Sequence, residues 1–353
     1  MYTLLVRAIS SSRKEARLTV DRLPCEIASG SSERSFTAPI NFDGHSFAIT
    51  AVPGSRKFWK WSDYALCDAN ISVIVIKASK GDLGIPDLLE LLFQAVGHGI
   101  ERFVVIINLF GGETDEDLES TRKHIQADLV RTFGPIAETV PILTIDPLRP
   151  NDLQALFKVL LSLPPIIYDS DAPFQLSVNS VMQKDDAVIV EGKVRSGSVC
   201  RGGAVFLEPP GLRLKVDSMR SVDGQDILVA SAGHSVALRI PGILKSHVST
   251  GMMLVGSRCV GKPTRLVRVE VCMVNNKYPI RCGFSPVVSI LSCQTLANIT
   301  ASDKDELLLG DTGTVTLSFQ KTIFVRSNCI ERMVFRQENV VIAIGVVREI
   351  LDD

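Results

Sequence analysis

Residues 49 to 59, ITAVPGSRKFW, combine a strand, a tight turn and a basic, aromatic segment. The run from His45 to Ala51 has the β-branched and apolar character of a strand, and Pro53-Gly54 then forms a turn signal. In nucleotide-hydrolysing α/β proteins, an aspartate just before such a turn holds Mg²⁺ beneath the γ-phosphate. Ala51 stands at that place, and no acidic residue lies between Ser46 and Asp63. The stretch therefore has the outline of a metal site without the carboxylate that would bind the metal.

A phosphate-binding loop needs glycines whose backbone N–H groups surround the phosphates, a lysine for the β- and γ-oxygens, and a Ser or Thr for Mg²⁺. The first strand-like run, TLLVRA, is followed by ISSSRKEAR, and no glycine precedes Gly30. No Gly-Lys-Ser/Thr triplet occurs in the chain. Lys14 lies near the position of the phosphate-binding lysine but without a glycine cradle. The alternative is that Arg13 and Lys14 begin a solvated helix.

Other residue types that could do chemistry are not arranged for it. The eight cysteines form no CxxC pair, and the five histidines form no HxxxH or HExxH array, so we expect reduced thiols and no metal site. His234 and Asp226 come without a nucleophile at the spacing of an elbow, so we predict no catalytic residues. Arg56, Lys57, Trp59 and Trp61 form a basic, aromatic cluster that could contact RNA or a partner. The alternative is that the two tryptophans are half-buried helix residues.

The composition is that of a folded protein with no bulk attraction to nucleic acid or membrane. Of 353 residues, 46% are hydrophobic and 22% are charged, and the net charge is −1, which argues against partners held by charge alone. The apolar run at the N-terminus is too short for a signal peptide, and no other run reaches membrane length. We therefore expect a cytoplasmic location, with neither membrane nor DNA as a partner.

The first 165 residues alternate strand and helix patterns, which predicts a mostly parallel sheet covered by helices. The apolar runs 71–76 and 103–107 have the length and continuity of strands buried on both faces. Residues 85–99 and 113–134 have the periodicity of helices, and residues 140–145 read as a strand. A last helix is predicted from residue 151, with Asn151 as its N-cap.

After Pro164-Pro165 the helical periodicity ends, and short strands are separated by Gly, Asp and Ser at the spacing of small β-barrels. Two such series meet between Gly256 and Pro263. The sequence thus predicts an α/β domain over residues 1–165, followed by all-β domains over residues 172–262 and 263–353.

This order of domains, with its motifs, resembles the elongation factor 1-alpha and EF-Tu superfamily of translational GTPases. The segment FQLSVNSVMQKDDAVIVEGKVRSGSVCRGG is similar to the opening of the second domain of that family through Gly192, Val194, Gly197 and Gly202. NNKYPIRCGFSPVVSILSCQTLANI is similar to the third domain in its eukaryotic and archaeal form. The resemblance implies a P-loop GTPase-like α/β domain followed by two β-barrels. The alternative is two unrelated small barrels.

The first domain resembles the family in its scaffold residues and departs from it in its chemistry. SSERSFTAP resembles the switch I signature and keeps Thr37, which the family uses on Mg²⁺ and the γ-phosphate. AVPGSRKF resembles Asp-x-Pro-Gly-His-x-x-Phe and keeps Gly54, with Ala51 and Ser55 in place of the Asp and His. VVIINLFGG resembles the guanine-reading strand and keeps Asn108. Leu109 and Gly111 stand where that motif has its Lys and Asp.

These losses predict a pseudo-GTPase: a translation-related factor that is not an enzyme and needs no cofactor. The missing Asp removes the hydrogen bonds that select guanine, and the missing loop removes the main electrostatic attraction for phosphate. The degenerate nucleotide positions would be Lys14, Thr37, Gly54 and Asn108. The resemblance implies a ribosome, a tRNA-like protein of translation or mRNA decay, or tRNA itself as the partner.

Two alternatives stay open. In the first, the protein is an atypical, slow GTPase in which Ser10 to Ser12 and Lys14 bind phosphate and Thr37 binds Mg²⁺. In the second, it is a tRNA-binding module that needs no nucleotide. Arg281 and Arg336 are the third-domain residues we name for RNA, within a larger basic set that would otherwise be solvated strand faces; the rest are Arg265, Arg268, Lys277, Arg326 and Arg332.

Overall fold

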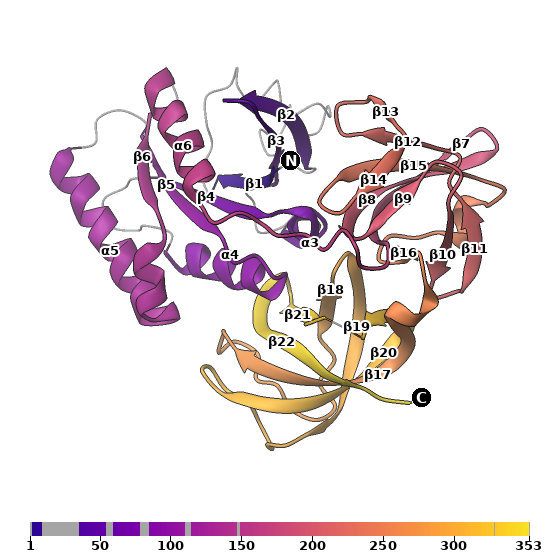
Figure 1. The fold of residues 1–353 in the computed structure, drawn as a ribbon. Helices are drawn as coiled ribbons and strands as arrows, with labels where there is room; N and C mark the ends of the chain where they lie inside the picture. Colours follow the sequence, from indigo (N-terminus) through magenta and orange to yellow (C-terminus); the bar gives the residue numbers. More distant parts are fainter. Residues whose placement is uncertain are drawn as a thin grey trace, which may run out of the picture. The chain divides into compact units, whose positions relative to one another are not determined.

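A computed structural model describes residues 2–8, 35–53, 59–77, 85–109, 114–146, 149–327 and 329–352 (Figure 1). The chain divides into two compact units, an N-terminal unit of Tyr2–Val96 and Ile100–Ile166 and a C-terminal unit that holds Ile167–Asp353. Four predicted site residues lie outside the described residues: Lys14, Gly54, Arg56 and Lys57. Among the residues described, no helix is long and apolar enough to cross a membrane.

The N-terminal unit is built on a six-stranded sheet in the order β2-β3-β1-β4-β5-β6. Five of its strands run parallel, and the edge strand β2 is antiparallel to β3. The strands are β1 (Tyr2–Ala8), β2 (Phe36–Phe42), β3 (His45–Ala51), β4 (Ile71–Lys77), β5 (Phe103–Asn108) and β6 (Ile142–Ile145). The predicted strands over 45–51, 71–76 and 103–107 are therefore confirmed.

Helices cover both faces of this sheet because its central strands are apolar on both sides. Ile74 and Val105 belong to a cluster with residues of α4 (Ile85–Gly97) and α5 (Asp115–Phe133). Val73 and Val104, the alternate residues of the same strands, pack instead with residues of α6 (Pro150–Ser162). The remaining elements of the unit are α3 (Trp59–Asp68) and the short helix η2 (Pro135–Thr139).

The helix starts follow from local side-chain chemistry, with one correction. Thr114 caps α5 through a reciprocal pair of bonds with Asp117, the capping-box arrangement. The prediction that Asn151 caps the last helix was wrong, because α6 begins at Pro150 and its N-cap is Arg149. Proline lacks the N–H that a cap would satisfy, and its fixed φ suits the first helical position.

The first part of the C-terminal unit is an antiparallel sheet of eight strands, β11-β10-β16-β7-β8-β15-β12-β13, beside a two-stranded sheet of β9 and β14. Its core unites Val205 of β10, near one edge, with Met219 of β12, near the other, so the sheet curls around one interior. The short helix η3 (Lys245–His247) follows β15. The strands are β7 (Gln175–Lys184), β8 (Ala187–Ser196), β9 (Ser198–Cys200), β10 (Ala204–Glu208), β11 (Leu212–Lys215), β12 (Ser218–Ser221), β13 (Asp226–Ile227), β14 (Val229–Ser231), β15 (Ser235–Pro241) and β16 (Met253–Val255).

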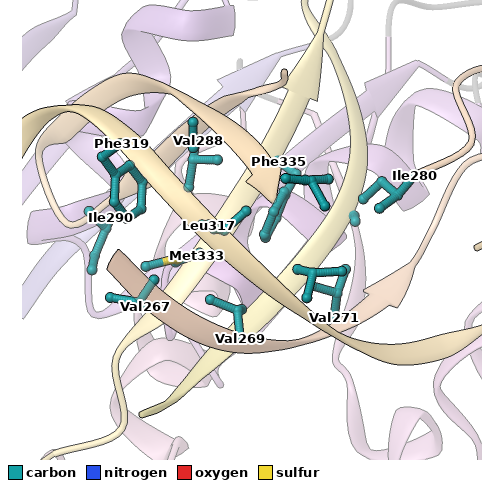
Figure 2. Close-up of a cluster of buried hydrophobic side chains, with 14 of the residues drawn as sticks. Val267, Val269, Val271, Ile280, Val288, Ile290, Leu317, Phe319, Met333 and Phe335 are labelled. Atoms are coloured by element: carbon teal, nitrogen blue, oxygen red, sulfur yellow. The ribbon is translucent and has the colours of Figure 1, made fainter. Parts of the chain in front are cut away.

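The second part is a closed barrel in the order β17-β20-β19-β18-β21-β22. Alternate residues of its strands point into a single apolar interior, in which Val269, Leu317 and Phe335 are fully buried (Figure 2). The strands are β17 (Gly261–Met273), β18 (Val287–Ile290), β19 (Cys293–Ser302), β20 (Thr312–Arg326), β21 (Arg332–Gln337) and β22 (Val340–Ile350). The predicted fold class, an α/β domain followed by all-β barrels, is confirmed.

The two β parts pack directly against each other. Met253 and Val255 of β16 share a buried cluster with Phe324 of β20. The buried Ser292 hydroxyl, at the β18–β19 turn, donates to the carbonyl of Val178 in β7 at 2.9 Å. Gly251 lies so close to Cys293 that a Cβ on it would be 2.6 Å from the Cα of Cys293. The two parts are linked by η4 (Arg258–Val260), which precedes β17.

Candidate functional site

The candidate site lies at the carboxyl ends of the parallel strands of the N-terminal unit. Successive strands β3 and β4 lie on opposite sides of β1, and ligands of open α/β sheets bind where the strand order reverses in this way. The last residues of the five parallel strands are Ala8, Ala51, Lys77, Asn108 and Ile145. None of these five is a carboxylate, and Ala51, opposite Val6 of β1, offers only a methyl group where a metal ligand would stand.

Thr37 is part of strand β2 rather than of a loop. It lies opposite Thr50 of β3, and the two hydroxyl oxygens are 2.8 Å apart. Each hydroxyl thus already has a hydrogen-bond partner within the sheet. This bond and the pairing of β2 with β3 fix the position of the Thr37 hydroxyl within the sheet.

Asn108 lies at the end of β5, opposite Lys77 of β4 and Ile145 of β6. The next residue, Leu109, donates its backbone N–H to the carbonyl of Ile145 at 3.0 Å. Leu109 thus extends the pairing of β5 with β6, and its place at the lysine of the guanine-reading motif remains a prediction. A use of Asn108 in nucleotide binding remains a prediction.

Sequence reasoning missed a buried polar contact between α3 and α4. Asp63 and Gln94 are both fully buried, and the Gln94 Nε2 donates to the Asp63 Oδ1 at 2.5 Å. The helical spacing indicates that Asp63 lies on the same face of α3 as the apolar residues Leu66 and Cys67, and that face is buried. The partner could not be read from the sequence, since it lies 31 residues away. Trp59 and Trp61 belong to the first turn of α3, and their use as partner contacts remains a prediction.

Most of the third-domain basic residues already interact with other groups of the barrel. Three of them form salt bridges, in the pairs Arg268–Glu349, Lys277–Glu338 and Arg326–Glu331. Arg265 instead donates to the backbone carbonyls of Phe319 and Gln320. This occupancy favours the interpretation that these residues stabilise the strand faces.

The two barrel arginines named for RNA binding differ in accessibility. Arg281 is exposed, whereas Arg336 in β21 is 3% exposed. A side chain buried to that extent cannot reach RNA while the barrel keeps this conformation. Arg281 is therefore the accessible one of the two, and its contact with RNA remains a prediction.

Two titratable groups of the C-terminal unit have shifted pKa values, Glu338 and His234. Hydrogen bonds from Tyr278 and Lys277 lower the pKa of the Glu338 carboxyl group, and they join the β21–β22 turn to the segment that follows β17. Burial lowers the pKa of the His234 imidazole, so the neutral form is favoured in the folded protein. Among the residues described, no group of three or more His, Cys, Asp or Glu side chains is placed to hold a metal ion.

The order of the fold, a nucleotide-domain-like sheet followed by two all-β parts, is that of solved translation elongation factors. Among solved structures, a bacterial selenocysteine-specific elongation factor EF-Sec matches 98% of this chain with a TM-score of 0.78 and 20% identity, over 58% of its own chain. Elongation factor SelB from Methanococcus maripaludis, in complex with a GTP analogue, matches 99% with a TM-score of 0.77 and 15% identity, over 79% of its chain.

Sequence comparison finds relatives with named roles in translation. The GTP-binding subunit of the eukaryotic peptide chain release factor from Kluyveromyces lactis is 23% identical over 269 residues, which are 69% of this chain and 38% of the relative. Elongation factor 1-alpha from Aeropyrum pernix is 23% identical over 298 residues, 76% of this chain and 67% of that relative. No protein-family model matches the chain. These similarities support assignment to the EF-Tu and elongation factor 1-alpha superfamily of translational GTPases, at modest identity.

Proposed function

We propose that the protein is a cytoplasmic, translation-related factor of this superfamily that has lost GTP binding and hydrolysis. It would act by binding a ribosome or a tRNA-shaped partner. The observation that carries the loss is the carboxyl edge of the sheet, where Ala51 ends β3 at the place of the metal-linked aspartate. Leu109 stands at the place of the lysine in the guanine-reading motif.

The missing residues would also weaken nucleotide binding energetically. A site built to hydrogen-bond a substrate group rejects an analogue that lacks this group by about 10⁴- to 10⁵-fold, so loss of the guanine-binding Asp removes a selection of this order. The loss of a phosphate cradle removes a second, electrostatic contribution. The two β parts, in contrast, each keep a large buried apolar core. We expect this difference between the nucleotide site and the β parts in a protein that still binds a partner but no longer binds and hydrolyses GTP.

Sedimentation with ribosomes tests the proposed role. The full chain would be incubated with purified ribosomes and centrifuged through a sucrose cushion, without nucleotide, with GTP and with GDP. Elongation factor 1-alpha serves as the nucleotide-dependent comparison. We expect the same bound fraction in all three conditions. Binding only with GTP would contradict the loss of the nucleotide cycle, and no association with ribosomes or tRNA would contradict the translational role.

A further inference from the structure

We propose that β2 and α3, the two segments on either side of β3 in the sequence, are each held in one position by bonds of their own. These two segments then keep one conformation whether or not nucleotide is present. What this means for a binding partner rests on the proposed function. The immobilisation of β2 and α3 does not depend on it.

The first segment is held by the sheet. β2 pairs with β3 along its whole length, from Phe36 opposite Ala51 to Phe42 opposite His45. Within this ladder the Thr37 and Thr50 hydroxyls form their own hydrogen bond at 2.8 Å. If Thr37 moved toward a ligand, its bond with Thr50 would break and β2 would separate from β3. The two losses would occur together, because the bond and the strand pairing depend on the same register.

The second segment is held by the buried pair between α3 and α4. Asp63 and Gln94 are both 0% exposed, and their bond measures 2.5 Å. Beside it, Leu66 of α3 packs with Val52, Ala95 and Ile100. The helix is therefore fixed at its middle by a polar contact and at its C-terminal half by an apolar one.

The chemistry of the pair explains why it would resist movement. Apolar contacts are non-directional, so one helix can slide over another and keep most of its buried area. A buried carboxyl group and a buried amide lose the bond between them when their alignment changes, and loss of a buried hydrogen bond is costly because water does not replace it. The Asp63–Gln94 pair thus opposes the displacement that apolar residues at these positions would tolerate.

A ligand shifts a conformational equilibrium only by its difference in affinity for the two states. Because both segments are held, a weak ligand would not move either β2 or α3 to a second position. Its partner would then recognise a constant surface, and binding would be regulated by the amount of protein or partner rather than by nucleotide.

Hydrogen–deuterium exchange of the full chain tests the holding of α3. Asp63→Ala removes the acceptor, whereas Asp63→Asn keeps an oxygen that can accept from Gln94. Thr121→Ala is the matched control, because the buried Thr121 hydroxyl bonds within its own helix, to the Asp117 carbonyl at 2.8 Å. Gln94→Met, which removes the donor and keeps the side-chain length, replaces Asp63→Ala if that variant does not fold.

We expect Asp63→Ala, or Gln94→Met in its place, to speed exchange in α3 by about tenfold or more relative to Thr121→Ala, with Asp63→Asn close to wild type. Equal exchange of α3 in the Asp63→Ala and Thr121→Ala variants would overturn the proposal.

A second arm adds near-millimolar GTP or GDP with Mg²⁺ to the wild-type chain while binding is measured separately. A nucleotide-dependent change of exchange in β2 or α3 would also overturn the proposal. Nucleotide binding without such a change would contradict the proposed loss of GTP binding and would leave the holding of the two segments intact.

Discussion

Gly251 offers a sharp test of the packing between the two β parts of the C-terminal unit. Its φ is +90°, and a Cβ at this position would lie 2.6 Å from the Cα and 2.8 Å from the Cβ of Cys293. A left-handed conformation costs a non-glycine residue about 1–2 kcal/mol. Forcing a methyl group into a packed interior adds about 1–3 kcal/mol. We therefore expect Gly251→Ala to lower the free energy of unfolding by about 2–5 kcal/mol.

Gly242→Ala is the matched control, because Gly242 has a φ of +73° and nothing lies within 4 Å of its added Cβ. It should lose only the backbone contribution, about 1–2 kcal/mol. Both tryptophans of the chain, Trp59 and Trp61, lie in the N-terminal unit, so denaturant unfolding is followed by far-UV circular dichroism. Hydrogen exchange of β16 and β19 localises the loss. Equal destabilisation by the two substitutions would refute the close approach of Gly251 to Cys293.

Three further predictions concern the C-terminal unit. Burial lowers the pKa of His234, so the unfolded chain binds the proton more tightly and stability falls as pH drops below about 6.5; unfolding measured from pH 5 to pH 8 should lose this dependence in His234→Gln. Partial burial of the thiol group, reinforced by the Glu331 carboxylate, raises the pKa of Cys329 to about 11 although the residue is exposed, so iodoacetamide should alkylate it more slowly at pH 8 than free cysteine. Glu331→Ala should accelerate that reaction and cost about 3–5 kcal/mol of stability, because Arg326 would be left with a buried, unpaired charge. In a filter-retention assay, Arg281→Glu should weaken tRNA binding more than Arg268→Glu, because Arg268 is already paired with Glu349; equal effects would argue against a contact at Arg281.

The strands of the N-terminal unit were predictable because their signal is local. Runs such as ISVIVI and FVVII are apolar at every position except Ser72, as expected of strands covered on both faces. The closed barrel was predictable for a related reason, since the alternate residues of β17 and β20 are buried in turn. Helix starts depend on one or two side chains, and the presence of Pro150 moved the start of α6 away from the predicted Asn151 cap.

The state of the predicted site residues depends on contacts that are distant in the sequence. Thr37 was interpretable as a degenerate ligand position, but its bond with Thr50 follows from the register of β2 on β3. The pairing of Arg268 with Glu349 joins residues 81 positions apart. The sequence therefore suggested more basic residues that could face RNA than remain exposed and unpaired with carboxylates in the barrel. The Asp63–Gln94 bond was missed for the same reason.

The central claim is the loss of nucleotide binding, and direct titration tests it. Fluorescent GTP and GDP analogues would be titrated against the purified full chain, with and without Mg²⁺, up to near-millimolar concentration. Elongation factor 1-alpha would be measured in parallel as a positive control. We predict no saturable signal for this protein under any of these conditions. Saturable, Mg²⁺-dependent binding would contradict the account and would favour an atypical GTPase with a phosphate site built from other residues.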